Sequence, residues 1–191
     1  MNYELKLSVL SLLISLISVI ISLITAYNNR KRLNVEIEPG LSEIDDIFLN
    51  IIDYENNSPI MNFGHGRVCY IKVVNPSPCD IAFFDLRVVD FKKTKPIFFL
   101  TSAILELYSY PSQQKLFHSC ENSISKLSIP NSNYGIFKSN SFTRIDLAFF
   151  PENATEILIS FKVAISTIKP NNEAGLRKKF KYYKKTFALT F

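Results

Sequence analysis

The sequence predicts a mainly β protein in which an N-terminal transmembrane α-helix is followed by an immunoglobulin-like antiparallel β-sandwich. Three observations predict this fold: a long uncharged apolar run near the N-terminus, apolar residues at every second position over most of the remainder, and Pro- and Asn-rich breaks between these stretches. Sixteen phenylalanines beside only five glycines suit packed strands better than a disordered chain. The 191 residues therefore divide into an anchor with a basic stop at 1–32 and one β-sandwich domain at 33–191.

The anchor is the run LKLSVLSLLISLISVIISLITAY, which carries no charge after Lys6. Its 21 residues from Leu7 to Tyr27 would form a helix about 31 Å long, close to the roughly 30 Å of a hydrocarbon core. A cleaved signal peptide would have a shorter apolar region and a cleavage site with small residues. A cut after Ala26 would leave Ile24 at the third position back, so the run favours a retained span.

The charges beside this span predict its orientation. Arg30, Lys31 and Arg32 follow it directly, whereas only Lys6 and the terminal amine precede it, beside Glu4. Basic flanks stay on the cytoplasmic side of a membrane. We therefore expect a single-pass protein of the cell membrane, with its N-terminus outside and its C-terminal domain in the cytoplasm.

Three cysteines, Cys69, Cys79 and Cys120, agree with a reducing compartment. Their odd number and the absence of a CxxC spacing argue against a disulfide framework and against a zinc site. Cys69 lies in an apolar strand pattern and is expected to be buried, whereas the other two have turn-like surroundings. Unpaired thiols fit the cytoplasm better than a secreted protein.

Small hydroxyl residues follow one face of the predicted transmembrane helix. They are spaced 3, 4, 3, 4 and 3 residues apart, and they are Ser8, Ser11, Ser15, Ser18, Ser22 and Thr25. Bilayer helices associate where small residues let backbones approach and where hydroxyl groups bond across the contact. Alternatively, each hydroxyl bonds to a carbonyl one turn earlier in its own helix and needs no partner. The strict register favours self-association, or pairing with another small-faced helix.

Period-2 alternation predicts the strands of the domain. In chain order they are Leu33-Val35-Ile37, Ile44 to Tyr54, Cys69-Ile71-Val73, Ala82-Phe84-Leu86-Val88, Ile145-Leu147-Phe149, Ile157-Ile159-Phe161-Val163-Ile165 and Phe187-Leu189-Phe191. Turn residues separate them at Pro39-Gly40, Asn56–Pro59, Asn75–Pro78, Pro130–Asn133, Pro151–Asn153 and Pro170–Asn172. Residues 97–127 read equally as strand or short helix. So many short strands with such breaks are typical of an immunoglobulin-like sandwich.

Three stretches carry a loose architectural resemblance: the anchor with Arg30-Lys31-Arg32, the segment YIKVVNPSPCDIAFFDLRVVD, and the ending RKKFKYYKKTFALTF. With these, the chain resembles uncharacterised single-pass, membrane-anchored β-sandwich proteins of Gram-positive bacteria and their phages. The resemblance implies the same architecture over most of the chain. It implies no activity and no functional residue.

Catalytic and metal-binding patterns are weak. The chain has two histidines and contains no GxSxG, HExxH, Walker or GxGxxG motif. His65, between two glycines, reads as part of a tight turn. Glu43, Asp45 and Asp46 lack the further oxygen ligands of a calcium loop and read as a solvated turn. We therefore expect no catalytic residue, no metal site and no cofactor.

A basic-aromatic segment near the C-terminus is the most distinctive candidate surface. Its cations are Arg177, Lys178, Lys179, Lys181, Lys184 and Lys185, and they interleave with Phe180, Tyr182 and Tyr183. The cations would suit anionic lipid headgroups, or single-stranded nucleic acid stacked on the aromatic rings. They would equally serve to protect an edge strand from pairing with other chains, which is the role we favour.

These features favour a membrane-tethered binding or scaffolding module, without catalytic activity, at the inner face of a bacterial membrane. Its expected partners are the lipid bilayer, another protein, and a second copy through the helix. A net charge of +5 alone does not indicate nucleic acid. One alternative is a phage- or mobile-element-encoded protein that interferes with the host or with a superinfecting phage. Another is a nucleic-acid-binding or enzymatic effector that uses Arg177–Lys185.

Overall fold

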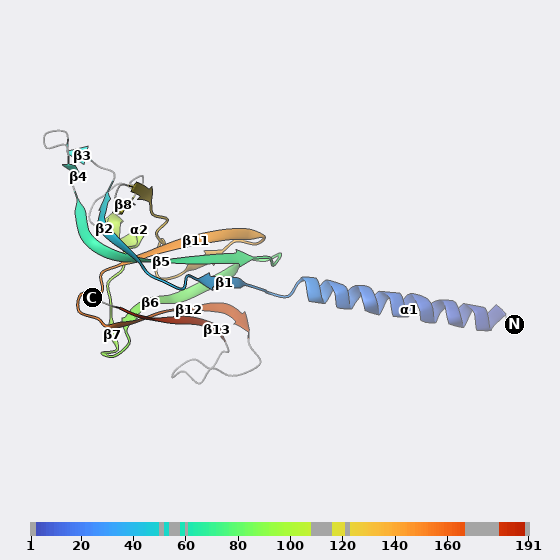
Figure 1. Cartoon of the computed structure of the whole chain (residues 1–191). Coiled ribbons are helices and arrows are strands. Elements are labelled where there is room, and N and C mark those ends of the chain that lie inside the picture. Colours follow the sequence, from blue (N-terminus) through green and yellow to red (C-terminus); the bar gives the residue numbers. More distant parts are fainter. Residues whose placement is uncertain are drawn as a thin grey trace.

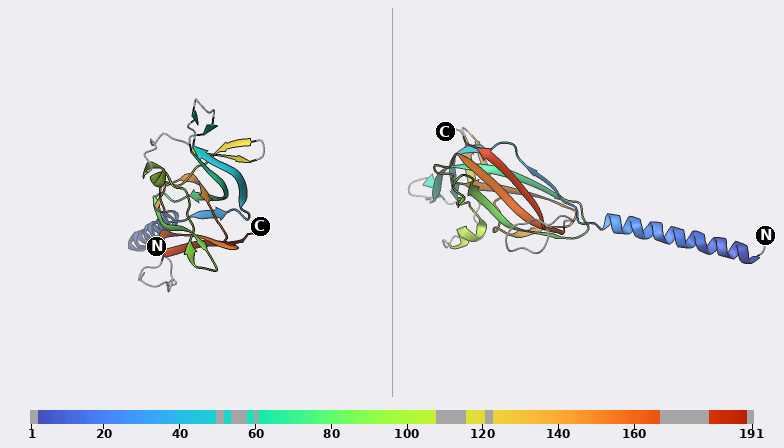
Figure 2. Two further views of the ribbon diagram at one scale, coloured as in Figure 1. Left: turned by 90° about the vertical axis from the view of Figure 1, so that its left-hand side faces the viewer. Right: turned by 90° about the horizontal axis from the view of Figure 1, so that it is seen from below.

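The computed structural model describes residues 3–49, 52–53, 58–59, 61–107, 116–120, 123–166 and 180–189. In this part of the chain, one long helix is followed by a mainly β domain of antiparallel sheets, as the sequence predicts. Figure 1 shows the helix projecting from one end of the domain, roughly along the direction of the strands. The right-hand view of Figure 2 shows the same arrangement from below.

The long helix is α1 (Tyr3–Asn28), and it is apolar on all sides apart from its hydroxyl residues. It ends just before the basic stop. The Asn29 N–H donates to the Thr25 carbonyl at 2.9 Å and the Arg30 N–H donates to the Tyr27 carbonyl at 3.3 Å. These two bonds satisfy carbonyl groups of the last turn that have no partner farther along the helix.

The larger sheet is built around β5 (Asn62–Asn75). β11 (Ser141–Phe149) pairs with one edge of β5, whereas β1 (Asn34–Ile37) and β2 (Ser42–Leu49) follow one another along the other edge. Beyond β2 the sheet continues with β8 (Leu116–Cys120) and β9 (Ser123–Lys126). The predicted break at Pro39-Gly40 is confirmed, and it separates β1 from β2.

The smaller sheet has β6 (Ile81–Asp90), β12 (Glu156–Ser166) and β13 (Phe180–Ala188) side by side. The two short strands β10 (Gly135–Phe137) and β7 (Lys95–Pro96) pair with the other edge of β6. β3 (Ile52–Asp53) and β4 (Ser58–Pro59) form a separate two-stranded ribbon. In Figure 1 the two larger sheets lie one above the other, and the strands of both run toward the end from which α1 leaves.

The main core lies between these two sheets. Alternate side chains of β5 and β11 face alternate side chains of β6 and β12, as half-buried strands require. The fully buried members include Cys69, Ile71, Val73, Leu147, Phe149, Ile157, Ile159 and Val163. Four of the predicted apolar alternations, those of β1, β5, β11 and β12, are therefore confirmed. Phe187 and Leu189 are buried as predicted, whereas Phe191 lies outside the described residues.

A second cluster covers the outer face of the larger sheet at the end away from α1. Its members come from β2, β5, β8, β11 and the short helix α2 (Ser102–Leu107), and they include Ile44, Val68, Leu100, Leu105 and Ala148. Because both faces of β11 are covered here, all residues from Ile145 to Phe149 are buried. The stretch 97–127 contributes both a helix, α2, and two strands, β8 and β9.

The prediction for β6 is wrong in its register. The sequence suggests one shared face for Ala82, Phe84, Leu86 and Val88. In the structure Ile81 and Phe83 are buried with Leu86 and Val88, whereas Ala82 is exposed. The reason is a bulge at Asp85, whose φ of 61° adds one residue against β12 and reverses the alternation.

Two predicted turns are also wrong. His65 is an exposed residue within β5, and the chain does not reverse its direction there. The neighbouring Gly64 has a positive φ of 75°, which coincides with a shift in the pairing register between β5 and β2. Glu43, Asp45 and Asp46 lie within β2 and not in a solvated turn. The predicted strand from Ile44 to Tyr54 begins earlier, at Ser42, and is described only as far as Leu49.

The other predicted turns have mixed outcomes. Asn75–Pro78, Pro130–Asn133 and Pro151–Asn153 separate strands as expected. Ser58-Pro59 belongs to β4, whereas Asn56, Asn57 and Pro170–Asn172 lie outside the described residues.

The bulge residue Asp85 holds two cations on the outer face of the smaller sheet. Its carboxylate lies 3.1 Å from the Lys162 Nζ and also contacts the Arg87 guanidinium. Partial burial would raise the pKa of this carboxyl, but hydrogen bonds from Lys162 and Arg87 outweigh it and lower the pKa below its usual value. A lowered pKa means that the pairing stabilises the fold above about pH 4 and that this stabilisation is lost as the pH falls through the folded pKa.

We predict that Asp85→Asn lowers the free energy of unfolding at neutral pH by about 0.5–1 kcal/mol, the range of a partly exposed ion pair. Asparagine tolerates the positive φ, so the bulge itself should persist. At a pH below the folded pKa the variant and the wild type should be equally stable. Denaturant titration of the detergent-solubilised chain at both pH values measures this. Glu106→Gln, at an exposed site on α2, is the matched control. A deficit of equal size at low pH would contradict the electrostatic explanation.

Candidate functional site

No part of the chain that the structure describes covers the apolar surface of α1. The span Leu7–Asn28 has 22 residues, and within it an 18-residue stretch with a mean hydropathy of 2.8 is 0% buried. Its leucine and isoleucine side chains are about half exposed or more. A membrane anchor and a signal sequence both have these properties, and the apolar surface in either case requires a lipid environment.

The hydroxyl face of α1 is largely satisfied within the helix itself. Ser11 Oγ donates to the Ser8 carbonyl at 3.1 Å, Ser18 Oγ to the Ile14 carbonyl at 2.9 Å, and Ser22 Oγ to the Ser18 carbonyl at 2.8 Å. These hydroxyl groups can therefore enter a bilayer without a partner. Self-association stays a prediction, and its physical basis is the small size of the face more than its hydrogen bonding.

Arg30, Lys31 and Arg32 are exposed, and they lie on a very short tether. The last helix-type bond is donated by the Arg30 N–H, and the first bond to the domain is donated by the Arg32 N–H to Ser77 Oγ at 2.6 Å. Ser77 Oγ in turn donates to the Arg32 carbonyl at 2.9 Å. Three residues, 29–31, lie between the end of α1 and the first bond to the domain. The Arg32 guanidinium also lies 5.3 Å from the centre of the Tyr27 ring.

Asn75 holds Ser77 in place. Its side-chain oxygen accepts the Ser77 N–H at 3.0 Å, and its amide group donates to the carbonyls of Cys79, Phe137 and Lys138. Asn75 is 1% exposed and Ser77 is 0% exposed, so leaving either unpaired would be costly. The sequence marks this stretch only as an Asn-led turn, and it gives no sign that the turn binds the chain leaving the helix.

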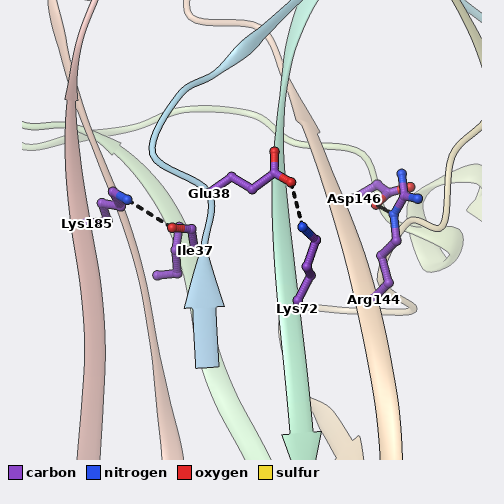
Figure 3. Close-up of polar contacts among 6 residues, drawn as sticks. All are labelled: Ile37, Glu38, Lys72, Arg144, Asp146 and Lys185. Carbon is purple, nitrogen blue, oxygen red and sulfur yellow. Dashed lines mark hydrogen bonds and ion pairs between the residues drawn. The ribbon is translucent and has the colours of Figure 1, made fainter. Parts of the chain in front are cut away.

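The basic-aromatic segment is only partly described. Arg177, Lys178 and Lys179 lie outside the described residues, whereas Lys181, Lys184 and Lys185 lie on the edge strand β13. The Lys185 Nζ donates to the Ile37 carbonyl of β1 at 2.9 Å, as Figure 3 shows. Lys185 therefore joins the two sheets at the side of the domain.

The aromatic residues of β13 have a similar role. Tyr183 stacks on Phe161 with ring centres 5.3 Å apart, and its hydroxyl donates to the Leu33 carbonyl at 3.2 Å. Lys181 lies 4.8 Å from the Tyr183 ring centre. These contacts fit the protection of an edge strand better than a set of free cations.

An ion pair with a buried carboxylate and a half-exposed guanidinium, which the sequence did not reveal, lies on the outer face of the larger sheet. Asp146 is 0% exposed, and its Oδ1 lies 2.6 Å from the Arg144 Nε. Its Oδ2 accepts the Ser128 N–H at 2.8 Å, and its own N–H donates to the Ser128 carbonyl. Figure 3 shows a second ion pair beside it, in which Lys72 of the neighbouring strand β5 lies 2.9 Å from Glu38. The Oδ2 of Asp146 thus attaches residue 128 to β11, whereas its Oδ1 is paired with Arg144.

His118 and Tyr70 complete this polar group. His118 is 9% exposed, and its Nδ1 has no hydrogen-bond partner among the described residues. Burial lowers the pKa of this imidazole, although Asp146 opposes the effect. Burial, and then Asp146, raise the pKa of Tyr70, whose ring centre lies 4.8 Å from the Arg144 guanidinium. Among the described residues, no group of three or more His, Cys, Asp or Glu side chains is placed to hold a metal ion.

The end of the domain opposite α1 carries an aromatic groove. Phe98 is 51% exposed and stacks on Phe150 with ring centres 6.2 Å apart, and Phe63 follows at 6.4 Å from Phe150. The groove beside Phe98 and Phe150 has a volume of about 240 Å³, and its charged lining residues are Lys93, Lys95, Asp90 and Glu152. Exposed aromatic rings edged by charged side chains are a suitable contact for another protein.

The cysteines follow the sequence prediction. Cys69 is 0% exposed, whereas Cys79 and Cys120 are half-buried, and all three are unpaired. Burial, with a smaller contribution from Glu38, raises the pKa of the Cys69 thiol to about 12. Cys69 is therefore an unreactive core residue.

No protein-family model, curated protein or solved structure matches this chain. Its function must therefore be inferred from the geometry of its own residues.

We predict that replacing Ser11, Ser15 and Ser18 with leucine weakens self-association of α1 in a membrane reporter assay by more than about tenfold. The estimate takes about 0.6 kcal/mol for each position lost from a helix–helix contact. The matched control replaces Val9, Ile20 and Ile24 with leucine, because at about 100° per residue these lie on the opposite face. An unchanged reporter signal in the serine variant would show that the hydroxyl groups serve only their own helix.

Proposed function

We propose that this chain is a single-pass membrane protein whose immunoglobulin-like domain binds another protein at the inner face of a bacterial membrane, without catalysing a reaction. The observation that carries the proposal is the exposed apolar helix, joined to the folded domain through the short segment 29–31. A leader that is removed after export needs no fixed connection to the domain. The Ser77 contacts instead attach Arg32, four residues after the end of α1, to the folded domain.

The strand order supports the immunoglobulin-like assignment. In that fold the first, second, fourth and fifth strands form one sheet, in which the second lies between the first and the fifth, and the third, sixth and seventh form the other. Here β1, β5 and β11 are neighbours in the larger sheet, and β6, β12 and β13 are neighbours in the smaller one. The hairpin β8–β9 and helix α2 then form an insertion between the third and fifth strands.

The basic stop supports the orientation. Arg30, Lys31 and Arg32 are exposed directly after the span, and cations in this position remain on the cytoplasmic side. The three unpaired thiols agree with that side of the membrane.

The use of the charged side chains supports a binding module more than an enzyme. Asp146, Asp85 and Lys185 are occupied by ion pairs or backbone contacts that hold strands together.

In the aromatic groove at the far end, Lys93 lies 3.8 Å from Asp90, whose carboxylate also accepts the backbone N–H groups of Lys92 and Lys93. The groove lies where a partner in the cytoplasm would meet it. Its two exposed lysines, beside Asp90 and Glu152, favour a partner segment that presents an apolar side chain next to an acidic residue.

We predict that a photoreactive phenylalanine analogue at Phe98 forms a discrete crosslinked product with another protein in intact cells. The same analogue at Tyr134, which is 65% exposed on another part of the surface, is the control and should form none. Lys93→Glu and Lys95→Glu in the same chain should reduce the product at position 98, because they reverse the charge beside the groove. Equal crosslinking from both positions, or none from position 98, would contradict binding through the groove.

A further inference from the structure

The short tether keeps one end of the domain close to the end of α1. Arg32 follows Asn28 by four residues, so its backbone lies within about 14 Å of the end of the helix. The 22 residues of the span reach about 33 Å, and this end of the helix therefore emerges into the polar layer of a bilayer, which is about 5–8 Å thick on each side. The strands that begin and end beside Ser77 cannot lie far from that layer.

Apolar side chains are exposed at this end. Phe142 and Val74 are paired across β11 and β5, one residue from the strand ends, and they are 61% and 44% exposed. Together with Asn34 they border a shallow hollow of about 300 Å³. Ile136 on β10 is a further exposed residue, at 57%. Outward positions of a strand that faces water on one side are usually polar. The apolar residues at these positions therefore indicate a surface that is covered by something other than water.

Cations surround the same end. Arg30, Lys31, Arg32 and Lys138 are all exposed. The nearby acids are fewer: Asp80 accepts the Ser139 N–H at 2.8 Å, and Glu36 lies opposite Lys72 across the strand pair. Apolar side chains bordered by cations are the combination that binds the surface of an anionic bilayer.

We infer that this end of the domain is a second membrane contact, in which Phe142 and Val74 enter the headgroup boundary of the bilayer that α1 spans, and Arg30, Lys31, Arg32 and Lys138 lie against anionic headgroups. This contact rests on the proposed anchoring of α1. It holds the domain upright, so that the aromatic groove faces away from the membrane. We assign this surface to lipid because the short tether after α1 keeps it close to the bilayer.

The chain has no tryptophan, so a single introduced tryptophan reports one position. Phe142→Trp in the full chain is reconstituted in vesicles of phosphatidylcholine and phosphatidylglycerol whose acyl chains carry bromine near the headgroup. We expect a roughly twofold or larger loss of fluorescence, because interfacial side chains lie about 5–10 Å deep. The loss should become smaller when phosphatidylglycerol is left out. Phe98→Trp, at the far end of the domain, is the matched control and should keep its fluorescence.

Leu16→Trp, in the middle of α1, separates this inference from the anchoring itself. Bromine deep in the acyl chains should quench it if α1 spans the bilayer. Quenching of Leu16→Trp without quenching of Phe142→Trp would overturn the second contact and leave the anchor intact. A blue-shifted but unquenched Phe142→Trp would also overturn it, since a protein surface would then cover the patch. No quenching of Leu16→Trp would refute the anchor and the second contact together.

Discussion

The hydroxyl group of Ser77 bonds to both the N–H and the carbonyl of Arg32, and this contact determines how the helix and the domain are connected. A buried hydrogen bond of this kind contributes about 1 kcal/mol, and leaving its partners unpaired inside the protein costs more. Asn75 fixes the geometry by bonding to three carbonyls of neighbouring turns. The connection is thus a built part of the fold, unlike the flexible linker that commonly separates an anchor from a domain.

This connection divides the apolar residues of the chain between two environments. The apolar side chains of α1 are exposed, whereas those of the domain fill the core between the sheets and the second cluster over the larger sheet. Among the described residues, no side chain of α1 packs in either cluster, and the exposed apolar surface of α1 suits a lipid environment. The exposed pair Phe142 and Val74 lies at the end of the domain next to α1, and this position is why we propose a lipid contact for it.

The sequence predicts the parts of this fold that depend on simple periodicity. The apolar run of α1 and the alternation in β5, β11 and β12 were correctly assigned because one face of each strand is buried in the same core. In β6 the alternation predicts the buried face correctly at Leu86 and Val88 and wrongly at Ala82 and Phe84, because the bulge at Asp85 depends on one positive φ that the alternation does not encode. The burial of Asp146 and Ala148 was missed because the second cluster covers β11 from the outside, and that cover comes from residues distant in sequence.

The candidate sites were predicted less completely than the fold. The basic stop and the hydroxyl face of α1 follow from local spacing, but the role of Ser77 depends on a contact across 45 residues. Lys185 looked like one cation among several, and only its place beside the Ile37 carbonyl identifies it as a link between sheets. The aromatic groove unites Phe63, Phe98 and Phe150 from three separate segments. Long-range contacts of this kind leave no pattern in a single sequence.

The central claim is that α1 is retained and places the domain on the cytoplasmic side of the membrane. Modification of the thiols by a membrane-impermeant reagent, in intact and in lysed cells, tests this most directly. The half-buried Cys79 and Cys120 should react only after lysis, and Cys69 should stay unmodified until the domain is denatured, because it is buried and its pKa is raised to about 12. Modification of Cys79 and Cys120 in intact cells would contradict the account, since it would place the domain outside, whether α1 is an inverted anchor or a signal sequence that has been removed.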